Sequence, residues 1–197
     1  DRNISVMGGG GGGMFLGPDC GNVKIINSVI VDNNANVSGK NIRLYKNTIA
    51  EKPSFINCII WKPEYSISYT SPQVPQSSDF INCAIQNPIS GGTTNCISLD
   101  PINTNPAGPN FVATDGSDWS LTINSPCINK GLDNSSDPDI PLTDFIGNIR
   151  VGTTDIGAYE YQSLVFIWEG DDISNPTIWT DPDNWNSGTV PSGNEDI

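Results

Sequence analysis

Acidic side chains that could bind a cation lie close together between residues 133 and 139. Asp133, Asp137 and Asp139 offer carboxylate oxygens, which are the ligands that Ca²⁺ prefers. The stretch lacks the glycine and the closing glutamate of a helix-loop-helix calcium site. Two interpretations therefore remain open, a calcium site and a solvated acidic turn.

A second charged group follows in the next part of the chain and consists of Asp144, Arg150, Asp155 and Glu160. One guanidinium among three carboxylates can form a buried or half-buried ion-pair cluster. The same carboxylates could instead serve as general acid and base. We favour the structural role, a clasp that fastens the C-terminal part of the fold, and we assign no catalytic residue in this chain.

The residues needed by several enzyme classes are missing. The chain has no histidine, so Ser-His and Cys-His nucleophilic systems cannot be assembled and a zinc site is close to excluded. A polysaccharide lyase needs a positioned base and a glycoside hydrolase needs paired carboxylates. The nine basic residues are scattered along the chain, and no expected strand carries two carboxylates at alternate positions. An enzyme is therefore the less favoured interpretation, and no cofactor is expected apart from the calcium considered above.

Aromatic residues suggest a possible contact with carbohydrate. Trp61, Tyr65 and Tyr69 lie at or within the Pro-, Ser- and Tyr-rich loop that runs from Lys62 to Asp79. An aromatic face can pack on the C–H groups of a sugar ring. The same rings could simply pin the loop to the body of the protein, and this alternative is favoured.

Composition narrows the class of protein and of partner. The 20 Gly and 15 Pro, with many Asn, Ser and Thr, punctuate the chain every few residues, and no stretch carries apolar residues at helical spacing for three turns. This composition is typical of an all-β protein. The formal net charge of −13 and the sequence pI of about 4.1 repel phosphate backbones, so nucleic acid is an improbable partner. The longest apolar run, Leu164 to Trp168, is too short to cross a bilayer.

A repeated phrase indicates how the chain is organised. Phe-Ile-Asn-Cys-(Ile/Ala)-Ile occurs at 55–60 and again at 80–85, with looser copies elsewhere. Each copy places an Asn and a small residue within a short run of β-branched and aromatic residues. In a parallel solenoid, like residues of successive coils fall on one another and Asn amides can bond along the stack. The predicted ladder comprises Asn27, Asn47, Asn57, Asn82 and Asn95. Their spacings of 20 and 25 residues fit one coil, while 10 and 13 fit two strands of one coil or a shortened turn.

The cysteines follow the same repeat. Cys58 and Cys83 occupy equivalent positions, and the chain has five cysteines with no CxxC pair. We favour stacking as small buried groups. A disulfide between neighbouring coils is the alternative.

The order of motifs from residue 93 to 161 resembles a known family. Asp100-Pro101, Phe111-Val112, Trp119 to Thr122, Ser125 to Gly131, Asp144 to Arg150 and Asp155 to Glu160 follow one another. This order resembles the C-terminal end of right-handed parallel β-helix proteins of the choice-of-anchor Q type. The chain departs from that pattern at Asn129, where the family usually carries Asp, and at Phe145-Ile146. The resemblance implies a right-handed parallel β-helix over residues 1–162, whose C-terminal segments cap the edge of the last coil.

The final residues differ in character. Trp168, Trp179 and Trp185, with Gly188 and Pro191, resemble the opening of a β-rich module that is repeated in large bacterial secreted proteins. We expect residues 163–197 to be an incomplete second module with these tryptophans in its core. Both ends of the chain are expected to be cuts through a longer polypeptide.

These observations favour a non-catalytic segment of a large secreted or cell-surface bacterial protein that serves adhesion, surface display or spacing. Likeness to modules of type IX secretion cargo implies the outer-membrane export machinery as a partner, and surface glycans are a second expected partner. The alternative is the C-terminal part of a β-helical polysaccharide lyase or glycoside hydrolase.

Overall fold

The computed structural model describes most of the chain and divides it into two compact units, residues 1–161 and 162–197. The described residues are 4–5, 11–17, 20–35, 39–45, 53–62, 66–70, 76–88, 91–99, 108–113, 115–162, 168, 177–185 and 190. Asn47 and Tyr65, which belong to two of the predicted sites, lie outside them.

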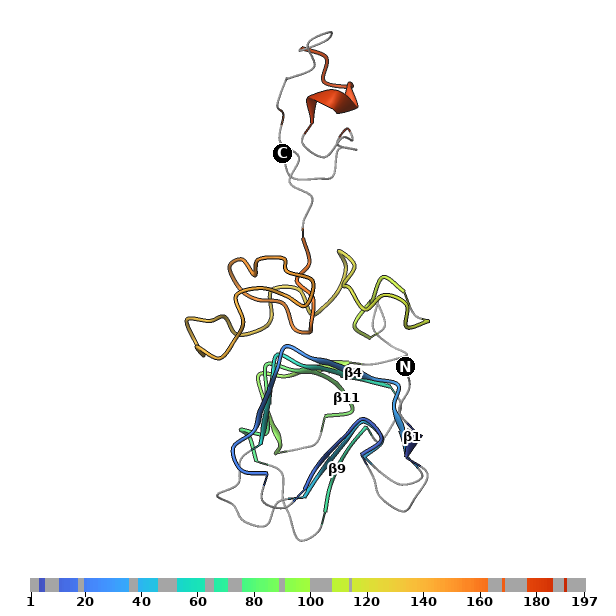
Figure 1. The fold of residues 1–197 in the computed structure, drawn as a ribbon, viewed down its shortest axis with the longest axis vertical. Coiled ribbons are helices and arrows are strands. Elements are labelled where there is room, and N and C mark those ends of the chain that lie inside the picture. Colours follow the sequence, from blue (N-terminus) through green and yellow to red (C-terminus); the bar gives the residue numbers. More distant parts are fainter. Residues whose placement is uncertain are drawn as a thin grey trace. The chain divides into compact units, whose positions relative to one another are not determined.

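The first unit is built from short parallel strands in three larger sheets (Figure 1). Sheet 1 contains β3 (Lys24–Ile26), β7 (Ser54–Ile56), β10 (Phe80–Ile81) and β12 (Thr93–Thr94). Sheet 2 contains β4 (Val29–Val31), β8 (Ile59–Trp61), β11 (Ala84–Gln86) and β13 (Ile97–Leu99). Sheet 3 contains β2 (Met14–Leu16), β6 (Ile42–Leu44) and β9 (Ile67–Tyr69), and β1 (Ile4–Ser5) pairs with β5 (Asn34–Ala35).

The chain visits the sheets in a repeating order, which defines its coils. β2, β3 and β4 form the first coil, β6, β7 and β8 the second, and β9, β10 and β11 the third. The fourth coil has only β12 and β13 among the described residues. The prediction of an all-β fold with parallel, stacked strands is confirmed, and the arrangement is that of a solenoid-like chain.

The register of sheet 1 corrects the predicted spacing of the repeat. Ile25 pairs with Phe55, Phe55 with Phe80 and Phe80 with Thr93. Equivalent residues are therefore 30, 25 and 13 positions apart. The predicted 20-residue spacing therefore does not correspond to one coil. The 13-residue spacing corresponds to a shortened coil, which was one of the two predicted alternatives.

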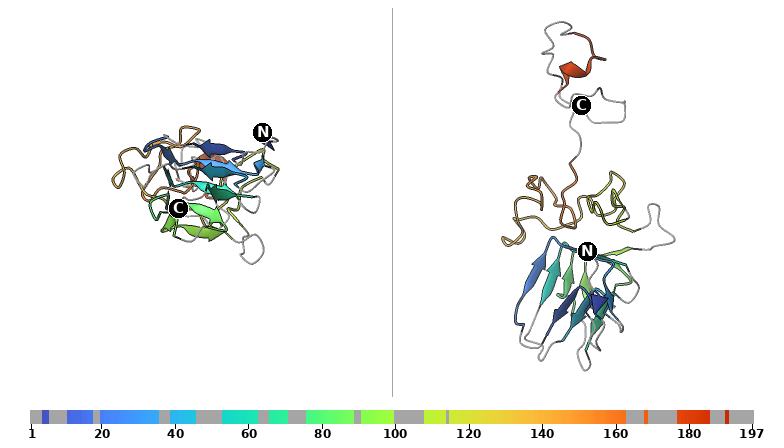
Figure 2. Two further views of the ribbon diagram at one scale, coloured as in Figure 1. Left: turned by 90° about the horizontal axis from the view of Figure 1, so that it is seen from below. Right: turned by 45° about the vertical axis from the view of Figure 1, so that its right-hand side comes forward.

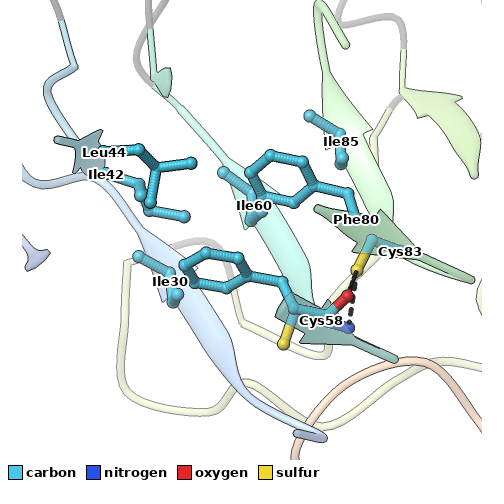
Figure 3. Close-up of a cluster of buried hydrophobic side chains, with 9 residues drawn as sticks. Ile30, Ile42, Leu44, Cys58, Ile60, Phe80, Cys83 and Ile85 are labelled. Carbon is cyan, nitrogen blue, oxygen red and sulfur yellow. Dashed lines mark hydrogen bonds between the residues drawn. The ribbon is translucent and has the colours of Figure 1, made fainter. Parts of the chain in front are cut away.

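The interior of the solenoid is packed by like residues of successive coils. Ile30, Ile60 and Ile85 are partners in sheet 2 and all point inward (Figure 3). Phe55 and Phe80 are fully buried, and their rings stack with centroids 4.9 Å apart. Burying each such side chain contributes about 1.5–3 kcal/mol to folding.

Asn residues form the corner between sheets 1 and 2. Asn27, Asn57, Asn82 and Asn95 follow the sheet 1 strands and have φ values of 45°, 53°, 47° and 52°. Asn is one of the few non-glycine residues that adopts this left-handed conformation readily. The repeated Asn therefore ends one strand and redirects the chain into the next.

Sheet 2 is buried on both faces. Its inward residues line the solenoid, and its outward residues, such as Val29, Ile59 and Ile97, pack against residues 108–113 and 115–161, which we call the covering segment. The outer core also includes Phe111, Leu121, Cys127 and Ile156 from that segment. Figure 2 shows the yellow-to-orange covering segment alongside the stack of strands. These contacts correct the prediction of a cap on the last coil, because the segment covers the side of several coils.

The second unit contains one short 3-10 helix, η1 (Pro182–Asn184), among its described residues. Trp168 lies 5.4 Å from Trp179 and 5.3 Å from Trp185, measured between ring centroids. Trp185 is buried, whereas Trp179 is about half exposed. The three rings thus gather into one cluster within this unit.

We expect Phe80→Ala to lower the free energy of unfolding by about 3–5 kcal/mol, because it leaves a cavity in the interior of the solenoid. Urea denaturation measures the change. Ile123→Ala is the matched control, since Ile123 is 69% exposed, and it should change stability by no more than about 0.5 kcal/mol. Equal losses in both variants would contradict the assigned core.

Candidate functional site

The covering segment is attached to the second coil through Asn57. Asn57 Nδ2 donates to the carbonyl of Leu132 at 2.8 Å, and the amide of Leu132 donates to Asn57 Oδ1 at 2.7 Å. The fully buried Asn57 side chain thus satisfies both backbone groups of Leu132, as a neighbouring backbone would. Gly131 permits this approach, since a Cβ there would lie 2.9 Å from Asn57 Cγ.

The Asn side chains at the neighbouring corners also form hydrogen bonds with the backbone of the covering segment. Asn27 Nδ2 donates to the carbonyls of Gly157 at 3.2 Å and Asp155 at 3.4 Å. Asn82 Nδ2 donates to Lys130 O at 3.0 Å, while the buried Asn82 Oδ1 has no hydrogen-bond partner. Asn95 is exposed. Three successive corners therefore bind the backbone of the covering segment.

The predicted ladder of amides is largely replaced by these contacts. One amide-to-amide bond joins described members of the ladder, from Asn57 Nδ2 to Asn27 Oδ1 at 3.5 Å. The left-handed corner directs the amides toward the covering segment, whose carbonyls lie 2.8–3.4 Å from them, closer than the neighbouring amide at 3.5 Å.

A different group of amides stacks at another corner and was missed from the sequence. Asn41 is fully buried and its Oδ1 accepts from Asn33 Nδ2 at 3.0 Å. Its Nδ2 donates to Lys62 O at 2.8 Å and to Ser66 Oγ at 3.2 Å. The types at these positions differ between coils, so no repeat marked them.

We expect Asn57→Gly to cost about 1–3 kcal/mol of unfolding free energy, because two partly buried backbone groups of Leu132 lose their partner. Asn57→Ala should cost about 1–2 kcal/mol more, since alanine resists the left-handed corner. Chemical denaturation measures both. Asn95→Gly is the matched control at an exposed corner and should be nearly neutral, and an equal loss there would refute the attachment role.

The predicted charged cluster is brought together, but its members have different partners. Arg150 donates to Glu160 Oε2 at 2.9 Å, and both side chains are at most 5% exposed. It also donates to the carbonyls of Gly157 and Ala158, each at 3.2 Å. The guanidinium thus binds one carboxylate and the turn that carries it.

The carboxylates of the cluster also accept hydrogen bonds from backbone amides. Asp155 accepts from the amide of Asn129 at 2.7 Å and also from that of Tyr161. Glu160 Oε2 accepts from the amide of Asp155 at 3.0 Å. Burial raises the pKa of Asp155 and of Glu160 above their usual values, although these hydrogen bonds and Arg150 oppose the increase.

Asp144 has the richest set of donors. Its oxygens accept from the amides of Ile146, Asn148 and Glu160 at 3.0, 2.8 and 3.0 Å, and from Asn148 Nδ2 at 3.0 Å. Burial raises the pKa of Asp144, but the donors outweigh burial and the pKa is lowered. Asp144 therefore organises the turn that it begins and joins it to Glu160.

We expect the stability contributed by Asp144 to be lost as pH falls. Because its pKa is lowered in the fold, the contribution is present above the unfolded pKa of about 3.9 and disappears as pH falls through the folded pKa. Asp144→Asn should flatten this acid limb in urea titrations at several pH values. Glu160→Gln should have the opposite effect. The pKa of Glu160 is raised in the fold, so its contribution to wild-type stability is lost as pH rises above the unfolded pKa of about 4.3, and the variant should not show this loss. An unchanged acid limb in Asp144→Asn would contradict the assignment.

The acidic loop considered for calcium is occupied by a lysine. Lys24 Nζ lies 2.8 Å from Asp137 Oδ2 and 2.7 Å from Asp139 Oδ2. Asp133 instead accepts from Ser135 Oγ at 2.7 Å and Ser136 N at 3.0 Å. In the part of the chain that the structure describes, no group of three or more His, Cys, Asp or Glu side chains is placed to hold a metal ion. The loop ties itself to β3 by an exposed ion pair, which contributes little to stability.

Two of the aromatic residues considered for glycan contact, Trp61 and Tyr69, are described and are engaged within the fold. Trp61 is 7% exposed and packs in the outer core, against Gly108. Tyr69 is half-buried against the solenoid interior, and its hydroxyl donates to Asp79 Oδ2 at 2.6 Å. Burial, aided by this bond, raises the pKa of Tyr69. Trp61 packs in the outer core and Tyr69 bonds to Asp79, and these contacts argue against the sugar-stacking hypothesis for the two rings.

None of the five cysteines forms a disulfide bond. Cys58, Cys83 and Cys96 follow the Asn corners and stack, with the Cys58 amide donating to Cys83 Sγ and the Cys83 amide to Cys96 Sγ, each at 3.3 Å (Figure 3 shows Cys58 and Cys83). Burial raises the pKa of Cys83 well above its usual value. The structure shows the stacking of small buried groups that was favoured, and not the disulfide between coils. The Sγ atoms of Cys83 and Cys96 also accept hydrogen bonds from backbone amides at the corners.

A pocket of about 450 Å³ lies between the covering segment and the first coil. The residues that line it from the first coil are Ile26, Asn27, Ser28 and Val29, and those from the covering segment are Pro141, Thr143, Asp144, Phe145, Arg150 and Ala158. The covering side belongs mostly to a turn that is closed by the antiparallel bridge between Thr143 and Ile149. We call residues 141–151 the hairpin. Of the residues in the hairpin, only Asp144 and Arg150 were among the predicted site residues.

Comparison with known proteins found no matching family model, curated protein or solved structure. Among the described residues, no helix has the length and apolar character needed to cross a membrane.

Proposed function

We propose that this chain is a non-catalytic scaffold segment of a large exported cell-surface protein, in which it serves adhesion, surface display or spacing. Residues 1–162 are proposed to be part of a right-handed parallel β-helix of the choice-of-anchor Q type. The right-handed form is supported by the strong preference for right-handed crossovers between parallel strands. Export by a type IX outer-membrane machinery rests on the sequence resemblance.

The observation that supports a scaffold role best is the use made of the buried carboxylates. Asp144, Asp155 and Glu160 all accept backbone amides, and Glu160 also pairs with Arg150. A general acid or base must keep an oxygen directed at its substrate. These carboxylates are instead used to fix turns of the covering segment, which is what a fastening cluster requires.

The packing of sheet 2 also supports a rigid spacer. One face of the sheet lines the solenoid and the other is sealed by the covering segment, as in parallel sheets generally. Corners of three coils are cross-linked by residues far along the chain. Such a unit is rigid and resists local opening, because opening one coil would break hydrogen bonds to another part of the chain.

We expect the purified chain to neither cleave nor bind polysaccharides, because its buried carboxylates and its aromatic residues Trp61 and Tyr69 are engaged internally. Incubation with a panel of polyuronates and neutral glycans, monitored for unsaturated products and new reducing ends, tests cleavage. A glycan array tests binding. Product formation would favour the lyase or hydrolase alternative, and a clean array signal would favour a glycan adhesin over a spacer.

A further inference from the structure

Two of the stacked cysteines lie beside each other on the third and fourth coils. β10 pairs in parallel with β12, and β11 pairs with β13, so the corners between them place Cys83 next to Cys96. Neighbouring strands lie about 4.7–4.9 Å apart, and a disulfide joins residues whose Cα atoms are about 4.4–6.8 Å apart. The spacing of the backbone therefore permits a disulfide between Cys83 and Cys96.

The sulfur atoms are already in contact along this stack. Cys96 Sγ accepts from the amide of Cys83 at 3.3 Å, and the side chains of Cys83 and Cys96 form a hydrogen bond with each other. Cys83 Sγ lies in the same way against the amide of Cys58, also at 3.3 Å (Figure 3). The three sulfurs thus form a row with Cys83 at its centre.

Access to solvent distinguishes the three thiols. Cys58 and Cys83 are fully buried in the interior of the solenoid, whereas Cys96 is only partly buried. The coils of Cys58 and Cys83 have a paired coil on both sides, while the coil of Cys96 is paired on one side among the described residues. A reagent from solution therefore meets Cys96 first.

The hydrogen bonds of the row also make Cys96 the more reactive thiol. Hydrogen bonding with the side chain of Cys83 lowers the pKa of Cys96, and the amide of Cys83 adds to this effect, although burial opposes it. Burial raises the pKa of Cys83, and its hydrogen bonds with Cys58 and Cys96 raise it further. Because the thiolate is the nucleophile in thiol-disulfide exchange, Cys96 is suited to attack while Cys83 stays protonated.

We propose that Cys96 and Cys83 are an oxidisable pair, in which Cys96 reacts with a disulfide from solution and Cys83 converts the product into a disulfide between the third and fourth coils. Cys96 is the attacking residue because it combines access with contact to a second thiol. Cys83 is the resolving residue because it is the neighbour of Cys96 in the row. Cys58 lies one coil further away and takes no part.

The reaction consists of two exchange steps. The Cys96 thiolate attacks one sulfur of the oxidant, so that a bond to Cys96 Sγ forms, the S–S bond of the oxidant breaks and one thiolate leaves. The Cys83 thiol then gives its proton to solvent and attacks Cys96 Sγ, which releases the second thiolate. Two protein thiols are oxidised, and one disulfide is reduced to two thiols. The first step removes the charge on Cys96 that helps to raise the pKa of Cys83, which favours the second step.

The bond would fasten the shortened fourth coil. Cys83 and Cys96 are 13 residues apart, and a cross-link between them limits the freedom of the opened chain. We expect the oxidised chain to exchange the amides of residues 93–99 about tenfold more slowly than the reduced chain. This chemistry is independent of the proposed scaffold role and adds to it a means of locking one coil.

The test uses the complete chain with Cys20→Ala, which removes the other partly buried cysteine. Cys127 is buried, and burial raises its pKa to about 12. The native, reduced chain is treated with an aromatic disulfide that releases a coloured thiolate. We expect about two thiolates to be released per chain, no adduct in the intact mass, and a peptide map that links Cys83 to Cys96. A lasting adduct on Cys96, or a link between Cys58 and Cys83, would overturn the proposal.

Three further variants in the same chain separate the roles. Cys83→Ala should release about one thiolate and keep an adduct on Cys96, because the resolving thiol is missing. Cys96→Ala should slow the release about tenfold or more, because the remaining thiols are buried. Cys58→Ala is the matched control and should react as the parent chain does. Equal rates in Cys96→Ala and the parent would refute the proposal, and the peptide map of the native pair decides it where a variant fails to fold.

Discussion

The left-handed corner between sheets 1 and 2 is the constraint on which the rest of the first unit depends. It ends each sheet 1 strand after a few residues and directs the chain into sheet 2, so that apolar residues of successive coils are stacked in register. Asn meets this requirement because its short amide tolerates positive φ. The same side chain then remains available to bind a backbone outside the coil. One residue type thus sets the path of the solenoid and the place where the covering segment attaches.

Covering one sheet on its outer face changes what the solenoid can do. Sheet 2 is protected on both faces, and its outward residues contribute to a core of their own. The covering segment is almost free of regular secondary structure, so its buried backbone groups need partners from elsewhere. Asn27, Asn57, Asn82, Asp144, Asp155 and Glu160 supply them. The hydrogen bonds of these polar residues to the backbone therefore explain their burial.

The charged cluster illustrates how geometry separates similar residues. Arg150 pairs directly with Glu160, whereas Asp144 and Asp155 are acceptors for amides. Burial raises the pKa of Asp155 and Glu160, and a denser set of donors lowers that of Asp144 despite burial. Similarly, Lys24 binds the acidic loop that was a candidate calcium site in the sequence. A cation of the protein itself, brought from a distant strand, offsets part of the negative charge of the loop.

The sequence by itself determined the fold class, the stacking of like residues and the importance of the Asn-Cys phrase, because a short-range pattern of apolar, amide and small residues is sufficient to specify strands and corners. It also indicated that Asp144, Arg150, Asp155 and Glu160 act together. Only the tertiary structure decided where the amides point, since the partner of Asn57 is 75 residues away and carries no recognisable motif. The same holds for the lateral position of the covering segment, the burial of Trp61 and the exposed hairpin. Each of these features depends on which surfaces are in contact in the folded chain, and the spacing of residues in the sequence does not specify those contacts.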